Sequence, residues 1–280
     1  MKKSTSWTFE PIGVAHTCFK EKFGIPRQPG LVSGATGTLK LNPRHEGEDL
    51  AGALRSLEGF SHLWVIFVFH EHDAKKWKPG IRPPRLGGNR KVGVLSSRSP
   101  HRPNPIGLSV VRIEKVNPDA KGGPEIEVSG VDLLDGTPIL DIKPYIPYAD
   151  SIPGAVGGWA EEPIPRTPVE FSAHAEARLK QILSTDGTGR YAGLRELIVE
   201  MLEIDPRPAF QKRRMPPGHP DAEGTRFGFN LLDFDVKWEI RGHSFLVLDI
   251  PQIASGLKTR PESPSESESD GSTSTGESPK

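Results

Sequence analysis

Residues 98–109 (RSPHRPNPIGLS) carry side chains that could bind a polar ligand. This segment holds three prolines, one glycine, two arginines, an asparagine and a histidine. Proline fixes φ and restricts the residue before it, so Arg102 and Asn104, which both precede prolines, are predicted to be extended. A loop stiffened in this way presents polar groups at little further entropic cost. A rigid connection between two strands is the alternative, but two arginines and an asparagine between prolines favour binding.

Two further loops have the same character. In residues 20–30 (KEKFGIPRQPG), Arg27 and Gln28 stand between two prolines, and residues 82–90 (RPPRLGGNR) contain Arg85 and Arg90. Together the three loops predict recognition of a polar, partly anionic ligand, and a nucleotide-like ligand fits. The sequence shows no Gly-rich dinucleotide fingerprint after a strand, no Walker loop, no G-x-S-x-G elbow and no zinc-deaminase signature.

The apolar segment 60–69 ends in His70, Glu71, His72 and Asp73. The end of a buried strand leads into a loop, where ligand contacts are common. Two other readings stay open, a solvated strand end and a metal site. The metal site is disfavoured because His70 and His72 alternate sides of an extended chain and no third ligand is evident nearby.

Charge is unevenly distributed although the formal net charge is zero. Residues 75–112 contain ten Lys or Arg and no Asp or Glu, whereas residues 259–280 contain five acidic and two basic residues. A basic segment of this length suits an anionic ligand or a nucleic-acid backbone, with an ordinary solvated surface as the alternative. A second basic cluster, beside Phe210, consists of Arg207, Lys212, Arg213 and Arg214. For that cluster an RNA contact and a solvated loop are equally open.

The chain contains 28 prolines and 30 glycines, which favours a loop-rich β architecture. Short strands are predicted at residues 9–14, 37–41, 60–69, 92–96, 108–116, 125–134 and 139–142, with one short helix at 49–57. Strands at this spacing indicate a sandwich or a closed barrel. After a linker at residues 151–168, helices at 172–183 and 191–204 and strands within 226–240 and at 244–250 predict a small α+β unit.

The single cysteine, Cys18, excludes an internal disulfide framework and a cysteine-cluster zinc site. The first residues lack the apolar core of a signal peptide, and no apolar run reaches transmembrane length. A cytoplasmic protein without a membrane segment is therefore expected. The Ser/Glu/Pro-rich residues beyond position 254 cannot bury enough apolar surface to fold, so a disordered tail is expected as well.

Five blocks of the sequence, in this order, strongly resemble the TrmO family. They are residues 20–30, 60–64 (FSHLW), 82–89, 98–109, and 132–138 (DLLDGTP) with 141–145 (DIKPY). Residues 205–210 (DPRPAF) and 233–238 (DFDVKW) resemble the C-terminal domain of that family. The resemblance implies a tRNA methyltransferase that uses S-adenosyl-L-methionine to methylate N6 of threonylcarbamoyladenosine at position 37, beside the anticodon. It also implies a homodimer and a compact all-β barrel that binds the methyl donor, in place of a Rossmann fold.

The expected fold is thus mainly β: an all-β barrel domain (residues 1–160), a small α+β C-terminal domain (161–255) and a disordered tail (256–280). Carried onto this sequence, the resemblance implies no metal and places the methyl donor at Pro26, Arg27, Gln28, His70, Glu71, Arg98, Leu108, Leu134, Asp135, Gly136 and Thr137. Asp135 and Glu71 are the candidates for a catalytic base.

The tRNA anticodon stem-loop is expected to contact Arg85, Arg90, Arg102, Asn104, Lys212, Arg213 and Arg214, although Arg102 and Asn104 could instead hold their own loop. Two competing readings remain. One is a non-catalytic RNA-binding barrel protein, and the other is a metal hydrolase that uses His70 and His72.

Overall fold

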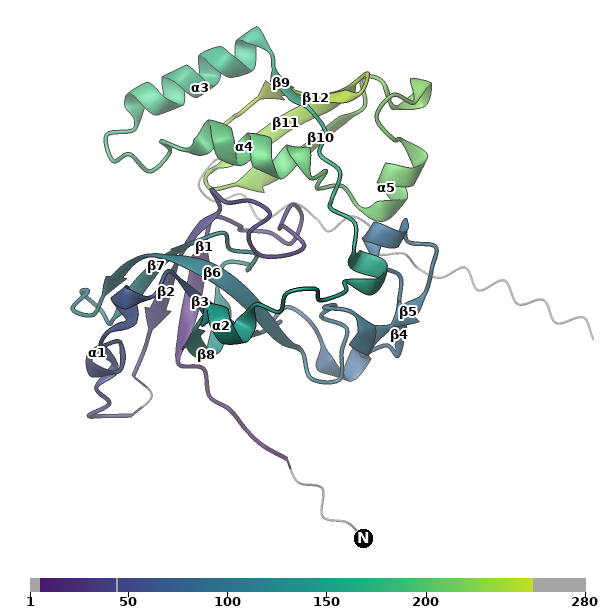
Figure 1. Ribbon diagram of the computed structural model, residues 1–280. Helices are drawn as coiled ribbons and strands as arrows, with labels where there is room; N and C mark the ends of the chain where they lie inside the picture. Colours follow the sequence, from purple (N-terminus) through teal and green to yellow (C-terminus); the bar gives the residue numbers. More distant parts are fainter. Residues whose placement is uncertain (1–5, 44, 254–280) are drawn as a thin grey trace, which may run out of the picture.

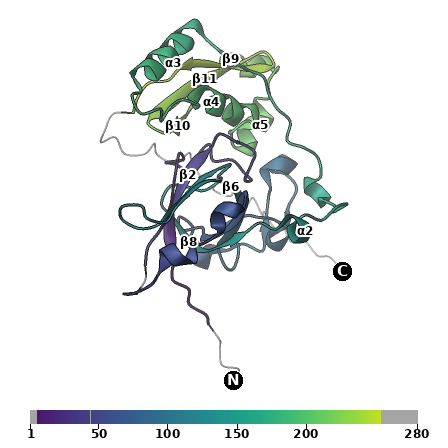
Figure 2. The same cartoon turned by 60° about the vertical axis from the view of Figure 1, so that its left-hand side comes forward.

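The computed structural model describes residues 6–43 and 45–253 of the 280-residue chain. The expected disordered tail, residues 256–280, lies outside these ranges. Figures 1 and 2 show a β-barrel on one side and a sheet with its helices on the other, with a long loop between them. Among the described residues, no helix is both long enough and apolar enough to cross a membrane.

The barrel consists of antiparallel strands that close in the order β1-β2-β7-β6-β3-β8. Their bounds are β1 Gly13–Thr17, β2 Thr36–Leu41, β3 His62–Val68, β6 Ile106–Asn117, β7 Glu125–Ser129 and β8 Thr137–Pro144. Alternate residues point inward, so that Leu63, Val65 and Phe67 of β3 are buried while their neighbours are not. A closed barrel has no unpaired edge strand, and the expected barrel is confirmed.

Gly107 of the 98–109 segment shows why this barrel needs a glycine. It pairs with Phe67 across β6 and β3. A Cβ atom at position 107 would lie 2.2 Å from the Phe67 ring. The ring fills the space that a side chain would occupy, and the absence of one lets β6 approach closely where it leaves the proline-rich loop.

Several elements differ from the sequence prediction. The strand predicted at residues 125–134 ends as β7 at Ser129, before Gly130 with its left-handed φ of 72°. The first strand begins at Gly13 instead of residue 9, because the ladder with β2 and β8 starts there, where Gly13 is paired with Leu41 and Ile139, one residue after the backbone hydrogen bond from the Ile12 N–H to Ile139. Only Val92–Gly93 of the predicted strand 92–96 is extended (β5, paired with β4, Gly80–Ile81), and Val94–Ser96 forms a 3₁₀ turn. The predicted helix 49–57 is shortened to α1, Leu50–Ala53, because Ser56 adopts a left-handed φ of 68° before a 3₁₀ turn at Leu57–Gly59.

The C-terminal part is a four-stranded sheet in the order β10-β11-β12-β9. Its strands are β9 Val169–Phe171, β10 Arg226–Leu231, β11 Phe234–Arg241 and β12 Ser244–Asp249. Its helices are α3 Ala173–Thr185, α4 Leu194–Glu203 and α5 Ala209–Arg214, and the one-turn helix α2, Pro147–Asp150, precedes them. The predicted helices near 172–183 and 191–204 are confirmed, whereas α5 and the short strand β9 were not predicted.

Arg207 does not belong to the exposed basic cluster in which the sequence analysis placed it. Its side chain is fully buried, and its Nε and Nη2 atoms donate to the Asp205 carboxylate at 2.8 Å each. Nη1 donates to the Met215 carbonyl at 2.8 Å, and the guanidinium lies 5.4 Å from the ring centres of both Phe227 and Phe245. The planar guanidinium therefore fixes both ends of α5 to the sheet.

Replacing Arg207 with alanine would leave the Asp205 carboxylate without its partner and open a cavity beside two aromatic rings. We expect the free energy of unfolding to fall by about 3–5 kcal/mol in chemical denaturation. Arg207→Lys should restore only part of the loss, because an ammonium group cannot donate in the bidentate geometry. Arg214→Ala, at an exposed position of α5, is the control and should change stability by less than about 0.5 kcal/mol. Equal stability of the Arg207 and Arg214 variants would contradict this role.

Candidate functional site

Arg98 and Gln28 connect two of the proline-stiffened loops. The Arg98 Nη1 atom donates a hydrogen bond of 2.6 Å to Gln28 Oε1, across 70 residues of sequence. An arginine side chain has five N–H groups in a planar fork, and this bond uses one of them. The bond fixes the direction of the guanidinium while leaving it suited to an anionic group. The structure thus brings together two of the residues that the sequence assigned to one site.

Asp132 is a third member of this cluster and was not predicted as a site residue. It follows β7, and its Oδ1 atom accepts a hydrogen bond of 2.6 Å from the buried Ser109 hydroxyl of β6. Burial raises the pKa of Asp132 to about 6, against the opposing effects of the Ser109 hydrogen bond and the Arg98 charge. The signal in the sequence was its place in the 132–138 block. Spacing alone could not show that it faces Ser109 and Arg98.

Asp135, only three residues further on, lies in a different environment. Its carboxylate accepts hydrogen bonds from the Thr17 backbone N–H and from Lys20 Nζ, both at 2.9 Å, and His16 Nδ1 lies 3.6 Å away. Burial acts to raise its pKa, but the Lys20 and Thr17 hydrogen bonds, with the Lys20 and His16 charges, outweigh burial and lower the pKa below its usual value. Asp135 is therefore ionised and occupied by its partners.

The turn around Asp135 is attached to the end of β1. The Gly136 N–H donates to the Ala15 carbonyl at 2.9 Å, and Gly136 has the positive φ of 82° that favours glycine. Thr137 Oγ1 donates to the Leu134 carbonyl at 2.7 Å. The predicted segment Leu134 to Thr137 is a rigid turn in the structure.

The residues after β3 meet the β1–β2 loop, residues 18–35. Lys22 Nζ lies 3.3 Å from the Glu71 carbonyl and 3.6 Å from Glu71 Oε2. His70 is exposed, and the ring of His72 stands edge-on to that of His101 with ring centres 4.3 Å apart. Within residues 6–43 and 45–253, no group of three or more His, Cys, Asp or Glu comes together in a way that could hold a metal ion.

Three residues that were predicted to contact the methyl donor have different surroundings in the structure. Pro26 is buried, Arg27 is exposed, and Leu108 is 51% exposed between the buried Gly107 and Ser109 of β6. Strand alternation turns Leu108 away from the barrel interior and away from the Ser109 hydroxyl. Leu108 therefore offers an apolar surface on the outer face of the barrel. Cys18 offers no nucleophile, because burial raises the pKa of its thiol to about 12.

The predicted RNA contacts divide into two groups. Arg85, Arg90 and Asn104 are exposed, whereas Arg102 Nη1 donates to the Ser97 carbonyl at 3.2 Å and so holds its own loop.

The helix α5 lies against the loop at residues 82–90, since Arg213 Nη1 donates to the Gly87 carbonyl. Burial lowers the pKa of Lys212, and the Arg27 and Arg207 charges add to this effect while Asp205 opposes it. Arg27 of the β1–β2 loop is thus close enough to Lys212 of α5 for the two charges to interact. Three basic segments that are far apart in sequence meet at this junction.

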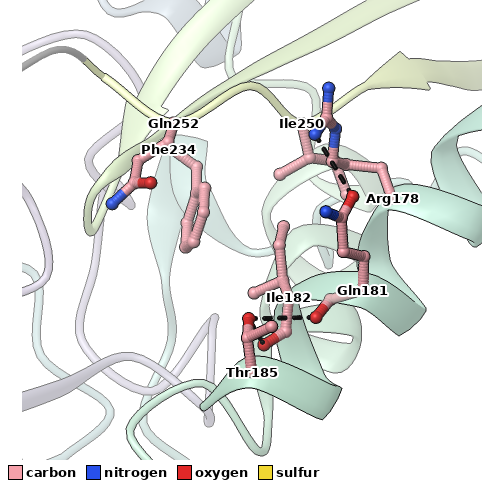
Figure 3. A pocket seen from close by; sticks show the side chains of 7 residues that line it. All are labelled: Arg178, Gln181, Ile182, Thr185, Phe234, Ile250 and Gln252. Carbon is pink, nitrogen blue, oxygen red and sulfur yellow. Dashed lines mark hydrogen bonds between the residues drawn. The ribbon is translucent and has the colours of Figure 1, made fainter.

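A cavity of about 120 Å³ lies elsewhere, between α3 and the end of the C-terminal sheet (Figure 3). Ile182, Phe234 and Ile250 form its apolar part, and Arg178 and Gln181 lie at its polar side. Its volume is far below the roughly 300–1,000 Å³ typical of ligand pockets, and none of the predicted site residues lines it. The cluster at the barrel is the better candidate.

Comparison with known proteins identifies the family to which this chain is similar. The family models for the tRNA-methyltransferase O N-terminal domain and the TrmO C-terminal domain match residues 14–151 and 164–253. The chain is 43% identical over 244 residues to a protein named tRNA (adenine(37)-N6)-methyltransferase from Escherichia coli (strain K12), which covers 87% of this chain and 97% of that protein. It is 45% identical over 241 residues to a putative S-adenosylmethionine-dependent methyltransferase, RcsF, from Pseudomonas aeruginosa, covering 86% of this chain and 96% of the relative.

Among solved structures, the crystal structure of TrmO from Pseudomonas aeruginosa superposes with a TM-score of 0.67 at 38% sequence identity, covering 88% of this chain and 99% of that one. The matches span both the barrel and the C-terminal sheet, and the relatives are matched over nearly their whole length. The chain therefore belongs to the tRNA-methyltransferase O (TrmO) family.

Proposed function

We propose that this protein is an S-adenosylmethionine-dependent methyltransferase that methylates N6 of threonylcarbamoyladenosine at position 37 of tRNA. The observation that carries the proposal is the Arg98–Gln28–Asp132 cluster on a barrel that matches the N-terminal domain of TrmO. The names of the relatives from Escherichia coli and Pseudomonas aeruginosa support the reaction and the methyl donor. The proposal also includes two details that the names of the relatives do not give: the threonylcarbamoyl group on the adenosine and a cytoplasmic location.

The residues of the cluster fit the chemical groups of the methyl donor. The remaining N–H groups of Arg98 suit its carboxylate, and the Gln28 side chain, bonded to Arg98, places an amide group beside it. Pro26 and the Leu134–Thr137 turn are assigned to the same donor. The exposed Leu108 and its neighbour Ile106 suit the face of an adenine. When bound, S-adenosylmethionine supplies an electrophilic methyl group, so the work of the protein is to orient the two reactants.

Asp132 is the proposed proton acceptor. The acceptor nitrogen of the substrate belongs to a urea and keeps its proton until late in the reaction, so a base near neutral pH assists the transfer. The pKa of about 6 leaves Asp132 ionised at pH 7 yet more basic than an ordinary aspartate. Asp135 and Glu71, the candidates from sequence, are instead engaged by Lys20 and Lys22. We therefore assign both of them to holding the β1–β2 loop.

We propose that the anticodon stem-loop binds across the junction between the barrel and α5. Arg85, Arg90, Lys212, Arg213 and Arg214 come from the segments that the Arg213–Gly87 contact joins. Phosphate binding by several cations makes affinity fall steeply with salt. Position 37 lies in a single-stranded loop, so its base can reach the site without opening a duplex.

A homodimer is part of the proposal. Several large apolar side chains are exposed, and Leu95, Tyr148, Ile152 and Val156 are all more than 70% exposed. The indole N–H of Trp159 donates to the Ser96 carbonyl at 3.0 Å, which joins the segment after Val156 to the residue that follows Leu95. An exposed apolar surface of this kind is typical of a protein interface.

Arg98→Ala should weaken binding of S-adenosylmethionine by about 10- to 100-fold, because a hydrogen-bonded charge near the donor carboxylate is lost. Arg55→Ala, at an exposed position just after α1, is the matched control. Calorimetry measures the affinity, and mass spectrometry of tRNA nucleosides measures the methylated product. A wild-type protein that binds tRNA without binding the methyl donor would support the non-catalytic RNA-binding reading. Donor affinity unchanged in Arg98→Ala would contradict the role of Arg98.

Asp132→Asn should lower the rate of methyl transfer by about 10²- to 10⁴-fold and remove the rise of the wild-type rate around pH 6.

The same substitution should increase the stability of the folded protein above pH 6, although it lowers the rate. Because the pKa of Asp132 is raised on folding, the wild-type protein loses stability as pH rises from about 4 to 6, and the variant does not. The variant should thus be about 3 kcal/mol more stable at pH 8 and equally stable at pH 4. The control is Asp119→Asn in an exposed turn, and a full rate in Asp132→Asn would exclude the base.

Ile152→Asp and Val156→Asp should each dissociate the dimer, since a carboxylate in an apolar interface is desolvated without a partner. Light scattering after size exclusion at micromolar protein concentration gives the mass directly. Leu183→Asp, at a half-exposed position on α3, should leave the mass unchanged. A wild-type protein with the mass of a single chain would refute the dimer.

A further inference from the structure

The β1–β2 loop, residues 18–35, carries three of the contacts that form the proposed site. Lys20 reaches Asp135, Lys22 reaches Glu71, and Gln28 accepts from Arg98. No part of this loop is helix or strand. Its conformation is therefore set by side-chain contacts and by a few separate backbone hydrogen bonds, such as that from the Gly30 N–H to the Gly130 carbonyl at 2.9 Å.

The far side of the same loop is attached to the C-terminal sheet and to α4 (Figures 1 and 2). The Cys18 carbonyl accepts from the Leu232 N–H at 3.1 Å, and Glu21 Oε1 accepts from the Asn230 N–H at 2.8 Å. Gly24, with a φ of 92°, lies beside α4 and β10, where a Cβ atom would be in ordinary van der Waals contact with Met201 and Phe229. The loop thus lies between the site and the C-terminal part of the chain.

Glu200 of α4 contacts the loop at Ser33 and Gly34, close to its end. Its Oε2 atom accepts from the Gly34 N–H at 2.9 Å, and its Oε1 atom accepts from the Ser33 hydroxyl. The helix behind it is fixed by the buried Leu197, Ile198 and Met201. Both carboxylate oxygens are therefore held in place, and hydrogen bonds to an anionic acceptor are stronger than neutral ones.

We propose that Glu200 is a positioning residue for the methyl-donor site, acting through the β1–β2 loop without touching the donor. This inference rests on the proposed function, since it concerns the same site. With Glu200 in place, the loop keeps Lys20 and Gln28 at Asp135 and Arg98. Without it, the loop samples other conformations, and the apparent dissociation constant rises in inverse proportion to the fraction that is competent to bind.

The experiment measures S-adenosylmethionine affinity by calorimetry in the full-length protein and in Glu200→Ala, Glu200→Gln and Glu196→Ala. Glu200→Ala should weaken binding by about 5- to 30-fold, and Glu200→Gln by less, because its amide oxygen can still accept one of the two hydrogen bonds. Glu196 is exposed on the same helix and makes the matched control, with an unchanged affinity expected.

Hydrogen exchange separates positioning from general destabilisation. In Glu200→Ala, the amides of residues 18–35 should exchange faster while those of β3 and β6 keep their protection. Ser33→Ala removes one of the two hydrogen bonds to Glu200 without changing α4, and should reproduce part of the loss of affinity. It replaces Glu200→Ala in this test if that variant does not fold.

The outcomes distinguish this inference from the function on which it rests. A wild-type protein that does not bind S-adenosylmethionine contradicts the proposed function itself. A wild-type protein that binds, with Glu200→Ala and Ser33→Ala binding equally well, overturns the role of Glu200 alone. A fall in melting temperature with an unchanged dissociation constant likewise overturns it, because Glu200 would then stabilise the fold without positioning the site.

Discussion

The structure of the site depends on how one irregular segment, the β1–β2 loop, is held. A loop without helix or strand must satisfy its polar groups through side chains and neighbouring backbone. Here one side of the loop is bound to the barrel through the Lys20–Asp135 ion pair and the Arg98–Gln28 hydrogen bond. The other side is bound to the C-terminal part through Glu21 and Glu200. Neither set of contacts alone fixes the loop along its whole length, so the geometry at Arg98 is a property of the whole chain.

Two carboxylates three residues apart, Asp132 and Asp135, show how different surroundings give the same side chain different pKa values. Asp135 has a cation and a backbone N–H as partners and is held ionised with a lowered pKa. Asp132 is partly buried, with one hydroxyl donor and a more distant arginine, and burial raises its pKa to about 6. The same side chain is therefore a structural anion at one position and, with its raised pKa, the proposed base at the other. Burial without full compensation costs stability, which is expected where a group is kept for chemistry.

The sequence predicted the barrel strands and the three proline-stiffened loops well, because proline, glycine and strand alternation act locally. It could not predict which residues meet. The sequence pointed to Asp135 and not to Asp132, since the difference between them lies in Ser109 and Lys20, which are distant in the chain. Arg207 looked like one more surface cation, whereas Asp205 and two aromatic rings bury it. The helix α5 is only one turn and a half long and depends on Arg207 for its position, so helical periodicity could not reveal it.

The position of α5 connects the proposed RNA-binding surface with the proposed methyl-donor site. Arg213 contacts the 82–90 loop, and Lys212 lies within electrostatic reach of Arg27, next to the Gln28 that binds Arg98. A phosphate placed between Arg27 and Lys212 would relieve the repulsion between two cations and so bind more tightly than at an isolated lysine. The same phosphate would pull on the loop that positions Arg98. Any free energy that RNA binding contributes to ordering this loop must, by linkage, appear equally as tighter binding of the methyl donor.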